Sequence, residues 1–356
     1  MRKRIYIYAY TAMNLGDDLF VKILCNRYPN ALFFIMSSRK VSIAFNEISN
    51  LKRIPDFTRI NKLSSKFKVS ASDIIQRLLS LHCDAVVNIG GSLFIQKGKW
   101  QKKITSFKKR IIQSRPYFIL GSNFGPFSSN IFLEEYKTIF YSLYDICFRD
   151  LLSYNLFSNL PNVRYAPDIV FSYPALHGTS KNQVIISVID LSARSALKEY
   201  ENVYINKMVE FTSLFLASGY EVYLMGFCEK EGDKKAVNKI AEKLDTAVVK
   251  QYVYSGNITE ALGLIQKSKY VIATRFHAMI LGWVSGKRVL PIIYSDKITN
   301  VIQDVAFDEQ YITIEGIDKV NVNEAIARLQ NSKPFSVVEQ CRFAETQFKI
   351  LDKLLI

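Results

Sequence analysis

Residues 269–294 read KYVIATRFHAMILGWVSGKRVLPIIY, and this stretch shows most clearly how the chain folds. Its first six residues, 269–274, form an apolar run rich in β-branched side chains, which is typical of a buried strand. An apolar helix is expected to begin near Arg275, and a second buried strand is expected at 288–294. A helix between two such strands is typical of a parallel sheet covered by helices.

The same alternation of strands and helices continues along the chain in both directions. Further strands are predicted at 5–10, 31–36, 84–89, 117–121, 145–148, 183–189, 221–227, 246–253 and 311–314. Further helices are predicted at 18–27, 72–81, 101–113, 130–143, 151 onward, 197–218, 231–244, 258–267, 296–305, 321–330 and 336–354. The pattern predicts an α/β protein whose parallel sheets are flanked by helices.

The length of the chain, 356 residues, exceeds the usual size of one domain, so two domains are expected. Residues 172–182 collect Ser, Pro, Gly and Asn and are the best candidate for a linker. We therefore predict a Rossmann-like domain at 1–175 and a second one at 183–335, facing each other. The C-terminal segment 336–356 is expected to form a helix that packs back on the N-terminal domain.

The formal net charge of +15 is concentrated in the first half of the chain. Residues 1–175 contain 25 Lys and Arg against 11 Asp and Glu, whereas residues 176–356 contain 22 against 21. Such a surface attracts phosphates, nucleic acid or anionic lipid headgroups, and composition alone does not choose among them. The sequence has no helix-turn-helix, zinc-finger or RNA-binding signature, so we expect no nucleic-acid partner.

The cysteines and histidines favour neither a disulfide framework nor a metal site. The cysteines are odd in number and none are close together, which fits a reducing, cytoplasmic compartment. Three histidines, His82, His177 and His277, are too few for a multi-histidine metal cluster, and we expect neither metal nor cofactor. The basic residues before the first apolar run are interpreted as the start of a strand rather than as a signal peptide. No apolar stretch reaches the ~18 residues that a membrane span needs.

Polar segments follow several predicted strands of the N-terminal half, where ligands of doubly wound sheets bind. These segments are Asn14-Leu15-Gly16-Asp17-Asp18, Gly90-Gly91-Ser92, Gly121-Ser122-Asn123-Phe124-Gly125-Pro126 and Arg149-Asp150. Their glycines form tight turns or let a ligand approach the backbone closely. Asp17 either accepts a proton from a hydroxyl or caps the next helix, and for Asp18 capping is the favoured interpretation. Arg149 is either an anion clamp or part of a salt bridge.

The second half offers the sharpest candidate, because Arg275 and His277 open a helix directly after a strand. The N-terminus of a helix carries partial positive charge, and Arg275 adds a full one, so both favour a phosphate or carboxylate there. An imidazole beside an anion keeps its proton more readily, which suits His277 for general acid catalysis near neutral pH. Lys297 follows the next strand and would supply a third donor to the same anion if the two strands are neighbours. His82 and His177 are interpreted as structural.

These segments, in this order, resemble the polysaccharide pyruvyl transferase family. The resemblance rests on an N-x-G-D segment, a glycine turn, a G-P turn, an R-D-x-x-S segment, an R-x-H helix start and a Tyr-x-x-Lys element. They stand here as Asn14 to Asp17, Gly90 to Ser92, Gly121 to Pro126, Arg149 to Ser153, Arg275 to His277 and Tyr294 to Lys297. There are two departures from the family pattern: Ser92 replaces a third glycine, and Ser122-Asn123-Phe124 replaces a more usual Gln-Gly-Ile-like stretch, of which the second bears on the choice of acceptor.

The resemblance implies a GT-B-like fold, with the basic N-terminal domain on the acceptor side and the C-terminal domain on the donor side. It implies phosphoenolpyruvate as donor and a pyruvate ketal on a sugar of a cell-surface polysaccharide, or of its undecaprenyl-pyrophosphate-linked precursor, as product. His277 and Asp17 are then the catalytic residues, and Arg275, Lys297 and Arg149 bind the donor. The acceptor or loop contacts are Asn14, Gly16, Gly90, Gly91, Ser92 and Asn123.

A basic stretch at 97–115 offers a further hypothesis about location. Its lysines alternate with Trp100, Ile104, Phe107 and Ile111, partly at helical spacing, which resembles a helix that lies on an anionic membrane. The alternative is a solvated basic face. The main rival for the function as a whole is a GT-B glycosyltransferase with a nucleotide-sugar donor, because the same anion-binding helix start would serve a diphosphate.

Overall fold

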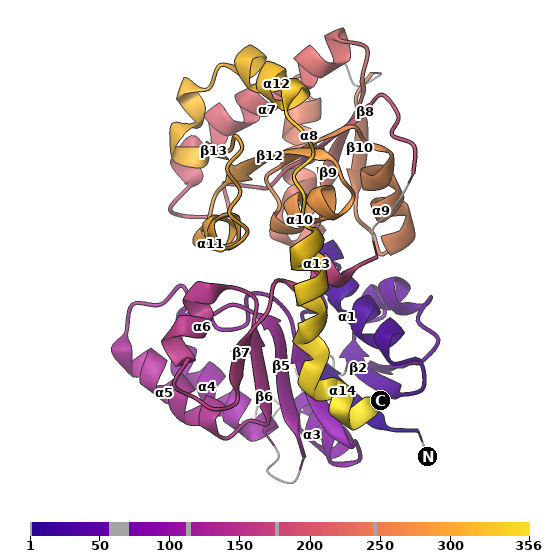
Figure 1. The fold of residues 1–356 in the computed structure, drawn as a ribbon, viewed down its shortest axis with the longest axis vertical. Helices are drawn as coiled ribbons and strands as arrows, with labels where there is room; N and C mark the ends of the chain where they lie inside the picture. The colour runs from indigo at the N-terminus through magenta and orange to yellow at the C-terminus, as the bar shows by residue number, and fades with distance from the viewer. Residues whose placement is uncertain (1, 57–70, 112–114, 175–177, 245–247) are drawn as a thin grey trace. The chain divides into compact units, whose positions relative to one another are not determined.

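A computed structural model of the chain describes residues 2–56, 71–111, 115–174, 178–244 and 248–356, which form two compact units (Figure 1). The first unit comprises the residues up to Thr11, Asp17–Ser172 and Arg342–Ile356. The second comprises Ala12–Gly16 and Tyr173–Cys341. The chain therefore passes into the second unit for five residues near its N-terminus, which the sequence did not predict.

The first unit is built on a seven-stranded parallel sheet in the order β3-β2-β1-β4-β5-β6-β7. The strands are β1 Arg4–Tyr8, β2 Leu32–Ser37, β3 Leu51–Pro55, β4 Ala85–Ile89, β5 Tyr117–Ser122, β6 Asp145–Phe148 and β7 Val163–Tyr165. The helices are α1 Leu15–Arg27, which starts in the second unit, α3 Ala71–Leu81, α4 Trp100–Arg110, α5 Asn130–Tyr141 and α6 Leu151–Phe157, with 3₁₀ turns η1 Val41–Phe45 and η3 Ile169–Ser172. Both faces of β5 are buried, which explains why its sequence, YFILGS, is almost continuously apolar.

The second unit repeats this plan with a six-stranded parallel sheet in the order β10-β9-β8-β11-β12-β13. The strands are β8 Gln183–Ser187, β9 Glu221–Gly226, β10 Lys250–Val253, β11 Tyr270–Ala273, β12 Arg288–Ile293 and β13 Ile312–Thr313. The helices are α7 Glu201–Ala217, α8 Asp233–Ala241, α9 Ile258–Lys267, α10 Phe276–Val284, α11 Asp296–Asp304 and α12 Val322–Asn331, with 3₁₀ turns η4 Lys198–Tyr200, η5 Glu229–Glu231 and η6 Ile314–Lys319. The predicted fold class, Rossmann-like units with parallel sheets flanked by helices, is confirmed.

The C-terminal residues form three short elements instead of the single helix predicted at 336–354, and the chain returns to the first unit at Arg342. These are α13 Val338–Ala344, the 3₁₀ turn η7 Glu345–Phe348 and α14 Lys349–Leu355 (Figure 1). The turn points Gln347 and Phe348 inward, and both side chains are completely buried. Gln347 accepts a hydrogen bond from Gly121 N–H at 3.0 Å and donates to the Ala166 carbonyl at 2.8 Å. Specific polar contacts thus explain the break in the helix.

Other differences from the sequence-based prediction have local reasons. The strands β3 and β7 were missed because β3 carries two charged residues and β7 has three residues in all. The predicted helix at 18–27 begins earlier, at Leu15, because Asn14 Oδ1 accepts a hydrogen bond from Gly16 N–H at 3.1 Å. Asn14 therefore makes a capping contact at this end of the helix. Part of the strand predicted at 246–253 lies outside the described residues, and β10 begins at Lys250.

Candidate functional site

Polar side chains of the second unit gather beyond the carboxyl ends of four neighbouring strands, β9, β8, β11 and β12. The strand order reverses between β8 and β11, because β9 lies on one side of β8 and β11 lies on the other. In doubly wound proteins, ligands bind in the crevice at such a reversal. The strands β11 and β12 are paired, so the segments after them, which hold Arg275 and Lys297, are neighbours.

Arg275 stands between β11 and α10, where its backbone N–H donates to Ser187 Oγ at 3.1 Å. Its side chain is buried and held by two carboxylates. Nε donates to Asp233 Oδ2 at 2.8 Å, Nη2 donates to Asp233 Oδ1, and Nη1 donates to Glu231 Oε2 at 2.6 Å. These bonds use three of the five N–H groups of the guanidinium.

Asp233 fixes this arrangement from the first turn of α8. It is completely buried, and its Oδ2 also accepts from the backbone N–H groups of Phe227 and Cys228 at 2.8 and 2.9 Å. Burial opposes a charge on Arg275, but the attraction of Asp233 outweighs it and raises the pKa of the guanidinium above its ordinary value. Arg275 is therefore a permanent cation in a rigid setting, and its own partners neutralise much of its charge.

The segment Ala12–Gly16 packs against one side of this site. Its Leu15 N–H donates to the Phe227 carbonyl at 3.1 Å, and Asn14 Nδ2 donates to Glu231 Oε1 at 3.4 Å. Burial opposes ionisation of Glu231, yet Arg275, followed by Lys297 and Arg194, lowers the pKa of its carboxyl below the ordinary value. Asn14 and Gly16, predicted as acceptor or loop contacts, thus lie among the predicted donor residues of the second unit.

His277 lies in the first turn of α10 and packs directly on the backbone of Gly16. A Cβ added to Gly16 would lie 1.7 Å from His277 Nδ1 and 2.3 Å from its Cε1. No side chain fits in this space, because real Cβ contacts start near 3.0 Å. The absence of a side chain at Gly16 therefore sets the position of the imidazole.

Tyr294 and two cations complete the cluster. The Nζ of Lys297 lies 5.5 Å from the centre of the Tyr294 ring, and the Cζ of Arg194 lies 5.2 Å from it. Lys297 is also 5.7 Å from the ring centre of Phe276. Burial opposes ionisation of Tyr294, but the charges of Lys297, Arg275 and Arg194 outweigh it and lower the pKa of the phenol. The site therefore has a positive potential around this ring.

The first unit has a separate polar cluster under the Gly90-Gly91-Ser92 turn. Arg149 is buried there, and its Nη1 donates to Asp168 Oδ2 at 2.9 Å while Nη2 donates to Asn123 Oδ1 at 2.6 Å. Ser92 Oγ donates to the same Asn123 oxygen at 3.3 Å. A Cβ added to Gly91 would lie 2.4 Å from Arg149 Nη1. Of the two interpretations of Arg149, the ion pair is the one observed, in a buried rather than an exposed setting.

Asp17 also belongs to this part of the first unit. It lies in the first turn of α1, and its Oδ1 would be 3.8 Å from a Cβ added to Gly90. Asp17, Gly90, Gly91, Ser92, Asn123 and Arg149 therefore gather near the carboxyl ends of strands in the first unit. The donor candidates Arg275, His277 and Lys297 gather in the second.

Apolar residues of α4 pack into the first unit. Ile104 and Phe107 are buried, and the ring of Trp100 lies edge-on to Phe132 at 5.4 Å. Ile104 and Phe107 are therefore not available to insert into a bilayer, which corrects the prediction for these two side chains, whereas contact of the segment with a membrane stays a prediction. The lysines of the segment are exposed among the residues described, and Lys108 pairs with Glu135 at 2.7 Å. In the described part of the chain no helix is both long and apolar enough to span a membrane.

Other features lie away from the cluster. His82 is exposed and its Nδ1 contacts the Leu78 carbonyl at 2.7 Å, whereas His177 lies outside the described residues.

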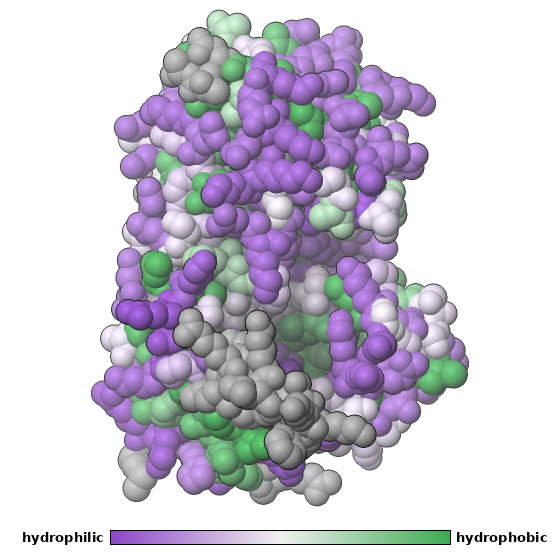
Figure 2. Space-filling view, turned by 180° about the vertical axis from the view of Figure 1, so that it is seen from behind, coloured by the Kyte–Doolittle hydropathy of each residue, from purple (hydrophilic) through white to green (hydrophobic). Residues whose placement is uncertain are grey.

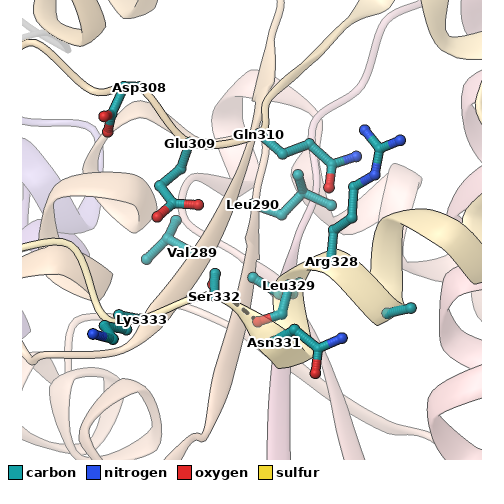
Figure 3. Close-up of a pocket in the computed structure, with 11 residues that line it drawn as sticks. Val289, Leu290, Asp308, Glu309, Gln310, Arg328, Leu329, Asn331, Ser332 and Lys333 are labelled. Carbon is teal, nitrogen blue, oxygen red and sulfur yellow. Dashed lines mark hydrogen bonds between the residues drawn. The ribbon is translucent and has the colours of Figure 1, made fainter.

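A hollow lined by Asp308, Glu309, Arg328 and Lys333 lies where β12 and β13 begin, at the opposite end of the sheet from Arg275 (Figure 3). On the face shown in Figure 2, hydrophilic side chains cover most of the second unit. Within the described ranges, no group of three or more His, Cys, Asp or Glu side chains could hold a metal ion.

Several residues of the site were missed by sequence reasoning. Glu231 and Asp233 follow the predicted strand at 221–227, and Arg194 follows the one at 183–189, so their positions after strands were a usable signal. Their contacts were not predictable, because Asp233 and Arg275 are 42 residues apart and meet only once the sheet forms.

Solved structures with similar folds fit this architecture. HepE from Anabaena, determined in complex with UDP and glucose, has a TM-score of 0.58 and 11% identity, with 99% of this chain and 99% of that chain covered. MnaA from S. aureus, determined with UDP, has a TM-score of 0.60 and 11% identity, with 100% and 98% covered. Together with the two parallel sheets, this likeness shows that the chain has a GT-B-like fold.

The family follows from the sequence match. The model of the family described as polysaccharide pyruvyl transferase matches residues 14–296, which is most of the chain. The protein therefore belongs to the polysaccharide pyruvyl transferase family, and the resemblance drawn from its motifs is confirmed.

Proposed function

We propose that this protein transfers pyruvate from phosphoenolpyruvate to a sugar of a cell-surface polysaccharide or capsule, or of its undecaprenyl-pyrophosphate-linked precursor, as a ketal. Family membership supports the general reaction. The observation that carries the choice of donor is the positive cluster of Arg194, Arg275 and Lys297 around Tyr294, at the strand-order reversal.

Phosphoenolpyruvate carries a phosphate and a carboxylate, so its binding needs several fixed cations. Arg275 and Lys297 are the donor contacts in the second unit, and the N-terminus of α10 adds partial positive charge beside them. Arg149 is a supporting residue of the first unit, where its ion pair with Asp168 holds Asn123 and the glycine turn in place.

The chemistry assigns a proton transfer to His277. As general acid it protonates the methylene carbon of the donor, which becomes a methyl group, and positive charge develops at the carbon that bears the phosphate. One sugar hydroxyl adds to that carbon, a second hydroxyl displaces the phosphate, and both C–O bonds of the ketal are then formed. Two hydroxyl protons are released in these steps. One restores the proton that His277 gave to the methyl group, and the other leaves with the phosphate.

The first unit supplies the acceptor side in this proposal. Asp17 accepts a hydroxyl proton, because it lies in the first turn of α1 near the glycine turn. Gly90, Gly91 and Ser92 would present backbone and hydroxyl groups to the sugar, with Asn123 held behind them. No step of this scheme requires a metal ion.

The experiment is an assay of phosphate release from phosphoenolpyruvate with lipid-linked and free galactose, mannose and glucose derivatives. Wild-type protein should release phosphate only when an acceptor is present. His277→Ala should lower the rate by roughly 10²- to 10⁴-fold, as expected for loss of a general acid. His82→Ala is the matched control, because His82 is exposed and outside the site. An unchanged rate in His277→Ala would contradict the role.

A nucleotide-sugar donor is the second candidate, because HepE and MnaA share the fold and were determined with UDP. Thermal unfolding separates the two candidates. Phosphoenolpyruvate should raise the melting temperature of the wild-type protein and UDP-sugars should not. The opposite pattern would favour a glycosyltransferase.

We also propose a cytoplasmic location with peripheral binding to anionic membrane through exposed lysines. Lys102, Lys103 and Lys109 of α4 are exposed, and binding would be electrostatic because the apolar face of this helix is buried. The triple Lys→Gln variant should lose flotation with anionic vesicles, whereas Lys234→Gln and Lys243→Gln, exposed in the second unit, should retain it. Equal flotation of all variants would contradict the proposal.

A further inference from the structure

Arg194 lies at the strand-order reversal, in the loop that follows β8, and the loop holds its side chain in place. Its Nη1 donates to the Asp190 carbonyl at 2.6 Å, and its Nη2 lies 3.9 Å from Glu231 Oε2. Asp190 is itself fixed, because its Oδ1 accepts from the backbone N–H and the hydroxyl of Ser192 at 3.0 and 2.6 Å. The side chain of Arg194 remains 24% exposed, so the guanidinium is positioned and still accessible to a ligand.

The charges of the cluster are unevenly compensated. Arg275 is bound bidentately by Asp233 and also by Glu231 at 2.6 Å, and its side chain is only 6% exposed. Among the described residues, Arg194 has one carboxylate contact, at 3.9 Å, which is too long for a hydrogen bond. The positive charge of Arg194 is therefore less neutralised than that of Arg275, so Arg194 is the stronger attraction for an anionic ligand.

The ring of Tyr294 lies beside this guanidinium. Its ring centre lies 5.2 Å from Arg194 Cζ and 5.5 Å from Lys297 Nζ, and the charges of both side chains lower the pKa of the phenol. An arginine from the loop after β8, a phenol that directly follows β12 and a lysine from the first turn of α11 thus lie close together. Such a set suits a tetrahedral dianion better than a planar carboxylate, because it offers donors from several directions.

We propose that Arg194 and the hydroxyl of Tyr294, together with Lys297, form the phosphate subsite of the donor site. This inference rests on the proposed function and deepens it, because it separates the group that binds the phosphate from Arg275. Arg194 donates guanidinium N–H groups to the phosphate oxygens, and Tyr294 donates its O–H. The donor carboxylate is then left to Arg275 and the start of α10.

The test measures binding of inorganic phosphate and of pyruvate separately by calorimetry, together with kcat and KM for phosphoenolpyruvate. Arg194→Gln should weaken phosphate binding and raise KM by roughly 10- to 100-fold, as expected for loss of charge-assisted hydrogen bonds, while pyruvate binding stays unchanged. Tyr294→Phe should act in the same direction and more weakly. Arg194→Lys should restore part of the phosphate affinity. Lys198→Gln is the matched control, because it removes an exposed cation four residues away.

The outcomes separate this inference from the function on which it rests. Wild-type turnover of phosphoenolpyruvate, with unchanged KM and phosphate affinity in Arg194→Gln, would overturn the subsite and leave the function standing. Equal loss of phosphate and pyruvate binding in a variant with a normal melting curve would also overturn it, since the subsite would then not be specific for phosphate. Wild-type protein that neither binds nor turns over phosphoenolpyruvate would overturn both.

Discussion

Replacing Gly16 with alanine should remove activity without unfolding the protein. The added Cβ would lie 1.7 Å from His277 Nδ1, whereas ordinary van der Waals contact begins at 3.4 Å, so the imidazole must move by about 1.7 Å. A misplacement of about 1 Å in an active site can cost roughly 10²-fold in rate. We therefore expect kcat to fall by at least about 100-fold in Gly16→Ala.

The stability of this variant should change little, because Gly16 lies in the first turn of α1 at an ordinary helical position. Alanine is favoured over glycine in helices by up to about 1 kcal/mol, which offsets the local repacking. Gly263→Ala is the matched control: Gly263 also lies in a helix, and a Cβ there meets nothing within 4 Å. Phosphate release and thermal unfolding are measured for both variants. Wild-type kcat in Gly16→Ala would refute the role of the Gly16–His277 contact.

Three further predictions concern the fixed groups of the two units. Asp233→Asn should lower the free energy of unfolding by about 3–5 kcal/mol in urea titrations, because it leaves the buried Arg275 without its main partner; a loss below about 1 kcal/mol would contradict this. Gln347→Leu should destabilise the first unit by about 1–3 kcal/mol for each buried group left unpaired, at Gly121 and Ala166, and an unchanged unfolding midpoint would show that these bonds do not matter. In wild-type protein, KM for phosphoenolpyruvate should rise with alkaline pH at values below about 10, the ordinary phenol pKa, because the lowered pKa of Tyr294 creates a phenolate that repels the donor. Tyr294→Phe should lack this rise, and identical pH profiles of the two proteins would rule it out.

The fold was largely predictable because it depends on local patterns. Apolar runs of four to six residues, separated by helical segments, mark strands such as 269–274 without any knowledge of their partners. The strand β3 escaped notice because Lys52 and Arg53 interrupt its apolar pattern. Its place in the sheet comes from pairing with β2, which is a tertiary effect.

The candidate site was predictable only in part, for the same physical reason. Arg275 and His277 could be found because strand and helix meet at their position in the sequence. The neutralisation of Arg275 by Asp233, and the contact of Gly16 with His277, join segments 42 and 261 residues apart. Nothing local in the sequence reports such contacts. Ile104 and Phe107 show the converse error, since their helical spacing predicted a membrane-facing surface, whereas both side chains are buried in the first unit.

The most direct measurement of the central claim is the reaction in deuterated water, followed by mass spectrometry and NMR of the product. Protonation of the donor methylene carbon predicts one solvent deuterium in the methyl group of each pyruvyl ketal, together with one phosphate released for each ketal formed. A product that carries a transferred sugar, or a ketal whose methyl group contains no solvent deuterium, would contradict the account.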